Sequence, residues 1–578
     1  MSNEATKTTD NSERYFFRAS AADFKKIPGS PIAYWLNKKI IEKFSEGKLL
    51  GNLLPVRGGM TTADNECFVR LWYEAEASST ALYELGKSRK WFPYNKGGEY
   101  RKWFGNRLWI VDWESDGQRI KQTGRASVRS EEFYLKEMIG WTDVTSYSQL
   151  GVRYYGSGFL FDASGPAVFP TEQYAFPLIL GFLGSRIASI ILQALNATLH
   201  VQAGNISDLP WLELSTENQS TLKNNVLSLV KQAEIDWNSY EISWDFPNFP
   251  LLHYEFIQPK LKASYQKIRV HWQEMTLEMQ RLEQENNRIF INAYGLQDEL
   301  TPEVPLKEIT LTCNPHYRYG NNKNEEELET LLLADTMKEF VSYAVGCMFG
   351  RYALEKPGLI LANQGETIED YLKQIPEPSF LADDDNVIPM LDGDWFTDDI
   401  TERFCKFLKV TFGDDHYEAN LTSIEKALGK DIRKYFLKDF YNDHVRRYKK
   451  RPIYWLFSSP KGTFNALIYM HRYRPDTVSV VLNDYLREFR TKLSAHKSHL
   501  EAVSISSSAS AGEKTKALKD IESHRKMIDE LDSYEREVLY PLATEQKEIN
   551  LDDGVKVNYQ KFGEALKKIP GLAAKNEE

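Results

Sequence analysis

The stretch SYQKIRVHWQEMTLEMQRLEQENNRIFINAY, residues 264–294, decides how the chain divides. It is rich in Glu, Gln, Arg and Lys, its apolar residues recur at helical spacing, and Gly295 follows it as a helix stop. We expect one long helix here. The sequence on its two sides differs in character, and the change falls near Thr216.

On the N-terminal side, short apolar runs such as CFVRLWYEA and LWIVDW alternate with Gly, Asn and Pro turns, which favours strands and loops. Two helices interrupt this pattern. One is expected at Ser30–Glu46, with Ser30 as N-cap and Pro31 at the first helical position. The other, Phe176–Leu195, is apolar but contains Pro177 and Arg186, so a buried helix fits it better than a membrane span.

On the C-terminal side, a helix is expected over residues 324–354. A further helix follows Arg472–Pro475 and runs to about Ala502. The Ser/Ala/Gly linker 504–512 separates it from a charged helix over 513–540. This pair predicts an antiparallel helical hairpin.

The sequence therefore predicts an α+β protein, in which a mixed α/β domain precedes a mainly helical C-terminal region with long helices. The expected order is a disordered tail at 1–20, the mixed domain at 21–214, a helical connector with the long charged helix at 215–300, a mostly helical domain with a basic patch at 301–478, and a helical hairpin with a C-terminal segment at 479–578.

Composition limits the class of protein. The formal net charge is −10, so any contact with nucleic acid must come from local patches. No apolar signal core opens the sequence, and we expect a cytoplasmic protein without a membrane partner. The cysteines lack metal-ligand spacing, so no metal and no disulfide is expected. They are Cys67, Cys313, Cys347 and Cys405.

The segment Val56–Arg70 is the first candidate for DNA contact. Its two glycines, Gly58 and Gly59, let backbone amides approach an anion. Hydroxyl and amide groups can reach phosphates or base edges, and two arginines add positive charge. A plain turn before a strand is the alternative. The candidate side chains are Arg57, Thr61, Thr62, Asn65 and Arg70.

Residues 81–130 form the second candidate, with 11 Lys/Arg against five acids. Aromatic residues are interleaved, a mixture that suits backbone neutralisation together with contacts to bases. A solvated strand-loop face is the alternative. The residues expected to contact DNA are Lys96, Arg101, Lys102 and Arg107.

Residues 443–474 form the third candidate, with eight Lys/Arg against the single acid Asp443. Such density favours a surface that follows phosphates, and a helix-packing or subunit surface is the alternative. The expected phosphate contacts are Arg446, Arg447, Lys449, Lys450 and Arg451.

These segments resemble the C-terminal half of the PglX family of BREX (bacteriophage exclusion) adenine-specific DNA methyltransferases. The resemblance covers nearly the whole chain after about residue 15. Its longest matches are RGGMTTADNECFVRLWYE (57–74), KWFPYNKGGEYRKWFGNRLWIVDWE (90–114), KKRPIYWLFSSPKGTFNALIYMHRYRPDT (449–477) and LDDGVKVNY (551–559). The glycine-threonine-asparagine element alone is shared more loosely with specificity domains of type I and type IIG restriction enzymes.

The resemblance implies a DNA target-recognition domain at 21–214, which reads a short site in double-stranded DNA. It also implies partners: a methyltransferase catalytic half that holds S-adenosylmethionine, or other BREX proteins. The sequence starts near the junction of the two halves, as a split-gene product, a truncated copy or an excised piece would. No catalytic or cofactor-binding residue of the family is therefore carried over to any position here.

Two alternatives stay open. Adenine methyltransferases use an Asn/Asp-Pro-Pro-aromatic loop to grip the flipped adenine. The nearest sequence here is Asn314-Pro315-His316-Tyr317, after the strand-like EITLT, but its second Pro is a His. A complete methyltransferase with a divergent active site would use Asn314 and Tyr317. The other alternative is an assembly protein of the BREX system that does not read DNA.

Overall fold

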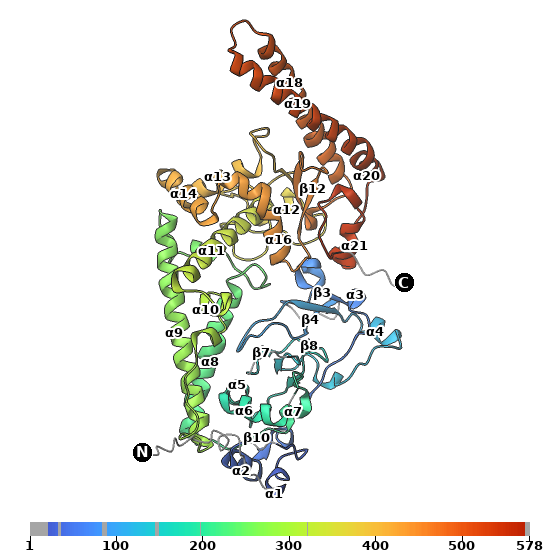
Figure 1. Ribbon diagram of the computed structural model, residues 1–578. Helices are drawn as coiled ribbons and strands as arrows, with labels where there is room; N and C mark the ends of the chain where they lie inside the picture. The colour runs from blue at the N-terminus through green and yellow to red at the C-terminus, as the bar shows by residue number, and fades with distance from the viewer. Residues whose placement is uncertain are drawn as a thin grey trace, which may run out of the picture.

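The computed structural model describes residues 21–32, 36–83, 89–144, 149–196, 198–320 and 322–572 (Figure 1). The tail at 1–20, which the sequence predicts to be disordered, lies outside these residues. The α+β architecture is confirmed, because small sheets fill the N-terminal part and long helices dominate from Thr216 onward. The domain boundaries remain predictions.

Two four-stranded sheets form the N-terminal part. The first is antiparallel and contains, in spatial order, β2 (Val56–Arg57), β9 (Ala167–Val168), β6 (Met138–Trp141) and β7 (Val152–Gly156). The second contains, in spatial order, β3 (Val69–Leu71), β5 (Trp109–Asp112), β4 (Trp91–Asn95) and β8 (Leu160–Phe161), of which β4 and β8 run parallel. A short pair, β1 (Lys48–Leu49) with β10 (Pro210–Trp211), brings the two ends of this part together.

The helix expected at Ser30–Glu46 is shorter in the structure. The described helix α2 spans Lys38–Glu46, and its N-cap is Asn37, whose Oδ1 accepts a hydrogen bond from the Lys39 amide at 2.8 Å. Ser30 has a φ of 50°, in the left-handed region, whereas an N-cap is normally extended. The prediction of Ser30 as N-cap was therefore wrong.

The apolar helix expected at Phe176–Leu195 consists of two buried helices, α5 (Phe176–Leu183) and α6 (Arg186–Leu195), bent by 63°. Ser185 lies at the bend, and its side chain caps α6. Within the described residues no single helix is long and apolar enough to cross a membrane, and this bent pair meets that test by length and composition alone.

The long helix predicted around residues 264–294 is confirmed as α9 (Leu261–Ala293), which packs along α8 (Thr216–Asn238) at one side of the molecule (Figure 1). With 33 residues, α9 is about 50 Å long. Near its end, Asn286 donates to the carbonyl of Gly181 in α5. At its start, the Leu261 amide donates to Asn420 of the C-terminal region. One helix thus contacts both parts of the chain.

The C-terminal region contains a sheet that the sequence did not predict. Its strands are, in spatial order, β11 (Val387–Pro389), β13 (Asn465–Tyr469) and β12 (Tyr454–Ser458), all antiparallel. Half of the segment predicted as a basic patch therefore lies in a buried hairpin. The helices beside it include α11 (Glu325–Met348), which confirms the helix expected at 324–354, with α13 (Ile400–Phe412), α14 (Tyr417–Leu428) and α16 (Tyr441–Arg447) (Figure 1).

The predicted antiparallel hairpin is confirmed: α18 (Arg487–Ile505) and α19 (Ala511–Tyr534) project from the body (Figure 1). Beyond it the chain returns to the N-terminal sheets through the segment around α21 (Gly554–Gln560). There the Asp552 carboxylate accepts from Trp91 Nε1 and pairs with Lys90 Nζ, each at 2.7 Å.

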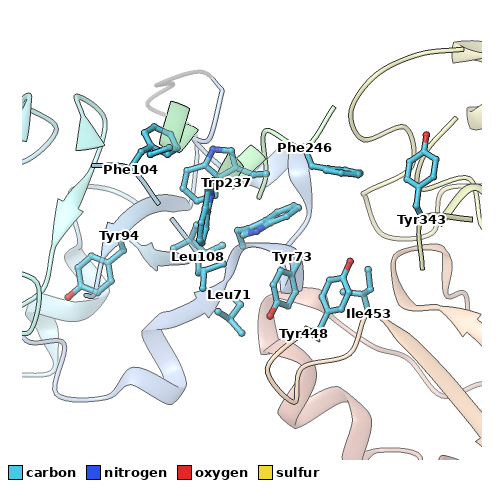
Figure 2. Packing of buried hydrophobic residues seen from close by; sticks show 14 of the residues in the cluster. Leu71, Tyr73, Tyr94, Phe104, Leu108, Trp237, Phe246, Tyr343, Tyr448 and Ile453 are labelled. Carbon is cyan, nitrogen blue, oxygen red and sulfur yellow. The ribbon is translucent and has the colours of Figure 1, made fainter. Parts of the chain in front are cut away.

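The N-terminal and C-terminal parts share one core. Figure 2 shows Leu71 and Tyr73 next to Tyr448 and Ile453, with Trp237 at the end of α8 close by. The rings of Tyr73 and Tyr448 meet edge to face, 4.8 Å apart. This shared core fixes the N-terminal sheets against the helical region.

Candidate nucleic-acid interface

The loop 57–65 connects β2 to α3 (Asn65–Phe68) across the N-terminal sheets. A Cβ on Gly59 would lie 2.0 Å from the carbonyl oxygen of Phe161, so the loop presses against β8 and only glycine fits there. A Cβ on Gly58 would meet no atom within 4 Å. Of the two predicted anion-binding glycines, Gly59 allows the loop to pack closely against β8, whereas Gly58 has free space around its Cα.

Polar side chains of this loop hold it in shape. The buried Thr62 hydroxyl donates to Asn65 Oδ1 at 2.9 Å. The same oxygen accepts from Lys96 Nζ at 3.2 Å, and Lys96 also pairs with Asp162 at 2.9 Å. Burial would raise the pKa of Asp162, but Lys96 together with hydrogen bonds from Ser164 and Tyr94 outweighs it and lowers that pKa below its usual value. Asn65 and Lys96 therefore reach the surface as one connected group, whereas Thr62 does not.

A second loop lies against this one. Thr61 and Ser127 exchange backbone hydrogen bonds of 2.9 and 3.0 Å, and Ser130 Oγ donates to the Gly58 carbonyl at 3.2 Å. The Arg57 guanidinium lies 5.1 Å from the centroid of the Phe133 ring. Lys136 Nζ lies 5.2 Å from the same centroid. The two loops thus bring cations distant in sequence to one strip of surface.

We call this strip the basic seam, and its exposed cations are Arg57, Arg125, Arg129 and Lys136. Neighbouring Lys121 pairs with Glu131. Within the described parts of the chain, none of the four seam cations forms an ion pair. Cations without a carboxylate partner are available to neutralise phosphates. The sequence predicted a role for Arg57, but only the fold places the other three beside it.

Several residues of the second candidate segment are structural instead. Arg101 is buried, and its guanidinium pairs with Asp236 of α8 at 2.6 Å. Lys102 is buried too and pairs with Glu283 of α9 at 2.5 Å. DNA contact by either residue would require breaking a buried pair, which is costly. We therefore correct the expectation: these cations join the N-terminal part to the two long helices.

Arg70, which is buried, and Arg107, which is partly exposed, are likewise held by contacts within the chain. Arg70 donates to the carbonyls of Glu66 and Asp552. Arg107 donates to the Tyr155 carbonyl at 2.9 Å, and burial lowers its pKa to about 10. Neither side chain is free to bind DNA, so both expectations are replaced by structural roles.

The third candidate segment is partly neutralised by acids from distant parts of the sequence. Only Lys450, among the five predicted phosphate contacts, forms no ion pair within the described residues. Arg446 is still largely exposed. The other four form the following pairs: Arg446 with Asp443 at 2.6 Å, Arg447 with Glu241 at 3.8 Å, Lys449 with Glu99 at 3.4 Å and Arg451 with Glu74 at 3.7 Å.

Two adjoining cavities of about 240 and 570 Å³ lie where these pairs cross between the two parts of the chain. Both are lined by Trp237, Ile242, Thr312 and Arg318. Together they have the size of a small-molecule pocket. Arg318 is paired with Glu339 at 2.7 Å, whereas Arg153 in the lining of the larger cavity forms no ion pair within the described residues.

Asn314, the nearest match to an adenine-gripping residue, is fully buried and caps α10 (Pro315–Tyr319). Its Nδ2 donates to the carbonyls of Leu306 and Ile309, and its Oδ1 accepts from the His316 amide. The strand expected before it is not present among the described residues 301–320. The residues at this position do not fit a methyl-transfer site, because the amide group is already used.

One acidic group was not singled out by the sequence. Asp383, Asp384 and Asp385 place three carboxylate oxygens within 4.8 Å of one another. Burial raises the pKa of Asp383 to about 8, although Arg403 opposes the rise. The group is held by Arg403, by the Val387 amide and by the Tyr485 hydroxyl, so it serves the structure at the start of β11.

Two curated proteins match this chain along almost its whole length. The adenine-specific methyltransferase PglX of Lacticaseibacillus casei (strain Zhang) is 34% identical over 577 residues, which cover 95% of this chain and 45% of that protein. The adenine-specific methyltransferase BrxX of Escherichia coli O9:H4 (strain HS) is 34% identical over 572 residues, which cover 95% of this chain and 46% of that protein. No protein-family model matches the chain. The chain is homologous to these methyltransferases and spans less than half of their length.

Proposed function

We propose that this chain, a homologue of adenine-specific methyltransferases, is the part that reads the DNA site in a BREX phage-defence methyltransferase. The observation that carries the proposal is the 34% identity along 95% of the chain to proteins more than twice as long. In this proposal, the remaining length of such a methyltransferase holds S-adenosylmethionine and transfers the methyl group.

The basic seam is the proposed phosphate-contacting surface, and the loop 57–65 beside it is proposed to approach the bases. Support comes from the lack of carboxylate partners at Arg57, Arg125 and Arg129 within the described residues and from the open backbone at Gly58. Thr61 and Asn65 of this loop, with Lys96, which follows β4 and contacts Asn65, are the proposed polar contacts. Phosphate contacts set position on the duplex, whereas contacts to base edges set sequence preference.

Arg446 and Lys450 are proposed as additional phosphate contacts, because Arg446 is largely exposed and Lys450 has no described ion pair. We do not extend the proposal to Arg101 or Lys102, whose charges are used inside the chain. The alternative of an active site at Asn314 loses support for the same reason, since its amide is fully hydrogen-bonded.

The test is binding of the purified chain to a pool of random duplex DNA across a series of salt concentrations, with and without S-adenosylmethionine. We expect enrichment of one short site that does not depend on the cofactor. The triple variant Arg57→Gln, Arg125→Gln, Arg129→Gln is expected to weaken binding to all sequences. Its salt dependence should fall by about 0.9 in slope for each phosphate that the variant no longer neutralises.

A matched control changes the same number of exposed arginines outside the basic seam: Arg281→Gln, Arg525→Gln, Arg536→Gln, each of which lies beside a glutamate. It has the same net charge as the seam variant and should bind DNA as the parent does. Equal weakening in both triple variants would reject the basic seam as the contact surface. Binding without any enriched site would reject the reading function itself.

A further inference from the structure

A pair of histidines lies between the two helices of the projecting hairpin, outside the proposed DNA interface. His496 Nδ1 of α18 is 2.9 Å from His524 Nε2 of α19, and the ring centroids are 4.9 Å apart. Nearer the body, the hairpin is joined by buried apolar residues: Phe489 and Leu493 of α18, with Leu531 of α19. The pair is therefore a polar layer within the hairpin, between these residues and the buried Ala517 nearer the tip.

The hydrogen bonds of His524 fix which nitrogen carries its proton. His524 Nδ1 lies 2.8 Å from the carbonyl oxygen of Asp520, and a carbonyl can only accept. Nδ1 therefore bears the hydrogen, and the lone pair of Nε2 faces His496. A histidine that binds a metal usually donates its other N–H to a backbone carbonyl or carboxylate in this way. His524 is thus already oriented as a ligand.

His496 is exposed at the surface of the hairpin, so an ion can reach the pair. Burial, with the neighbouring His524 and His499, lowers the pKa of His496. Imidazole binds a metal in its neutral form, through a nitrogen that carries no hydrogen.

We propose that His496 and His524 bind a divalent transition-metal ion between them, of the class that imidazole suits, such as zinc, nickel or copper. In the metal-free pair, His496 Nδ1 carries the hydrogen that bridges to His524. On binding, this hydrogen is carried by Nε2 of the same ring instead, and Nδ1 coordinates the ion. Metal binding by this route therefore neither takes up nor releases a proton.

The geometry needs only a small adjustment. Two nitrogens that bind one tetrahedral zinc ion at the usual bond length are about 3.3 Å apart, a few tenths of an ångström more than in this pair. Water is the ligand we assign to the remaining positions. The bound ion would fix α18 against α19 where apolar contacts are few.

The experiment is calorimetric titration of the untagged full chain with zinc chloride, together with hydrogen exchange of residues 487–534. Zinc is expected to bind and to slow exchange in both helices. His496→Gln and His524→Gln should each weaken this binding roughly tenfold or more. His271→Gln, an exposed histidine on α9, is the control and should bind zinc as the parent does.

Hydrogen exchange without zinc shows whether the hairpin of each variant is still folded. Zinc held by Asp383–Asp385 would persist in both histidine variants and would not slow exchange in the hairpin. Unchanged zinc affinity in both variants, or a hairpin whose exchange zinc does not alter in the parent, would overturn the proposal. In that case the two rings form only a hydrogen-bonded pair that sets the register of the helices.

Discussion

At the scale of single residues, the adjacent glycines Gly58 and Gly59 differ in what they tolerate. A Cβ on Gly59 would lie 2.0 Å from the Phe161 carbonyl oxygen and 2.4 Å from its carbon, so the loop or β8 must move. Gly59→Ala is expected to lower the free energy of unfolding by about 2 kcal/mol or more. Gly58→Ala adds a Cβ in open space, and we expect a change within about 0.5 kcal/mol.

Urea denaturation of the two variants and the parent measures this difference. Because the substituted residues are neighbours and the chemical change is identical, each variant is the control for the other. An equal decrease of stability in the two variants would mean that the loop does not press on β8 as described.

Lys102 provides a second prediction at this scale. Lys102→Met keeps the length of the side chain but leaves the buried Glu283 carboxylate with Trp103 Nε1 as its remaining described partner. Removing one member of a buried ion pair typically costs about 3 to 5 kcal/mol. Lys449→Met, at a more exposed residue paired with Glu99, should cost less than about 1 kcal/mol.

Chemical denaturation of both variants tests this, and DNA binding of the folded Lys102 variant adds a second readout. If Lys102 contacts DNA instead, its variant should be nearly as stable as the parent, and its DNA binding should depend less on salt. The segment that contains it shows why sequence alone misassigned it. Lysine and arginine mixed with tryptophan suit a DNA surface, but the same mixture forms buried pairs when Asp236 and Glu283 arrive from distant helices.

At the scale of elements, two buried histidines lie beside the C-terminal sheet, and their titration affects stability. His471 follows β13, and burial lowers its pKa to about 3, with a further contribution from Arg351. His444 of α16 accepts a hydrogen bond from the Tyr454 amide, and burial, with Arg447 and Arg351, lowers its pKa as well. Both side chains are neutral in the folded protein near neutral pH.

In the unfolded chain these histidines take up protons near pH 6.5, whereas folded His471 stays neutral down to about pH 3. The unfolded state binds more protons in this window, so stability is complete above the unfolded pKa and falls as the pH decreases. The decrease approaches about 1.4 kcal/mol per pH unit for each histidine. Denaturation at several pH values between these limits should show this slope.

His471→Gln removes one titrating group and can still donate to the Ala75 carbonyl, which His471 Nε2 contacts at 3.1 Å. We expect this variant to reduce the slope of the free energy of unfolding against pH by the contribution of one histidine. An unaltered slope in the His471 variant would show that this ring gains a proton as easily in the folded state as in the unfolded chain.

Helices and strands were not equally accessible from the sequence. The helices α9 and α11 were predicted from long helix-forming runs of apolar residues, and α18 and α19 from the Ser/Ala/Gly linker that separates two such segments. Several strands of the N-terminal sheets have only two residues, such as β2 and β9, which is too short for an alternating pattern. The sheet of the C-terminal region was missed because its residues Tyr454–Tyr469 lie inside a charged segment that favoured a surface role.

At the scale of the whole molecule, charge could be counted from the sequence, but its pairing could not. Residues 443–474 carry a strong positive excess, yet Glu74, Glu99 and Glu241 approach three of its cations from far earlier in the chain. Conversely, Arg125, Arg129 and Lys136 remain without ion pairs within the described residues and meet Arg57 only through folding. The candidate site is defined by the cations that have no carboxylate partner after folding, and tertiary structure decides which cations these are.

The C-terminal segment around Asp552 provides the last prediction, because it connects the end of the chain to the N-terminal sheets. Burial would raise the pKa of Asp552, but hydrogen bonds from Lys90 and Trp91 and the charge of Arg70 lower it below its usual value. The attachment is therefore complete above the ordinary aspartate pKa and is lost as the pH falls through the lowered one. Asp552→Asn is expected to lower the free energy of unfolding by about 1 to 2 kcal/mol near neutral pH. It should also speed hydrogen exchange in β4 and in residues 549–559.

Asp553→Asn changes the neighbouring carboxylate, whose pair with Lys561 is 3.5 Å long and partly exposed, and it should have little effect. If both variants exchange like the parent, the Asp552 carboxylate is not what attaches this segment, and its other contacts, such as the Arg70 hydrogen bond to the Asp552 carbonyl, are sufficient.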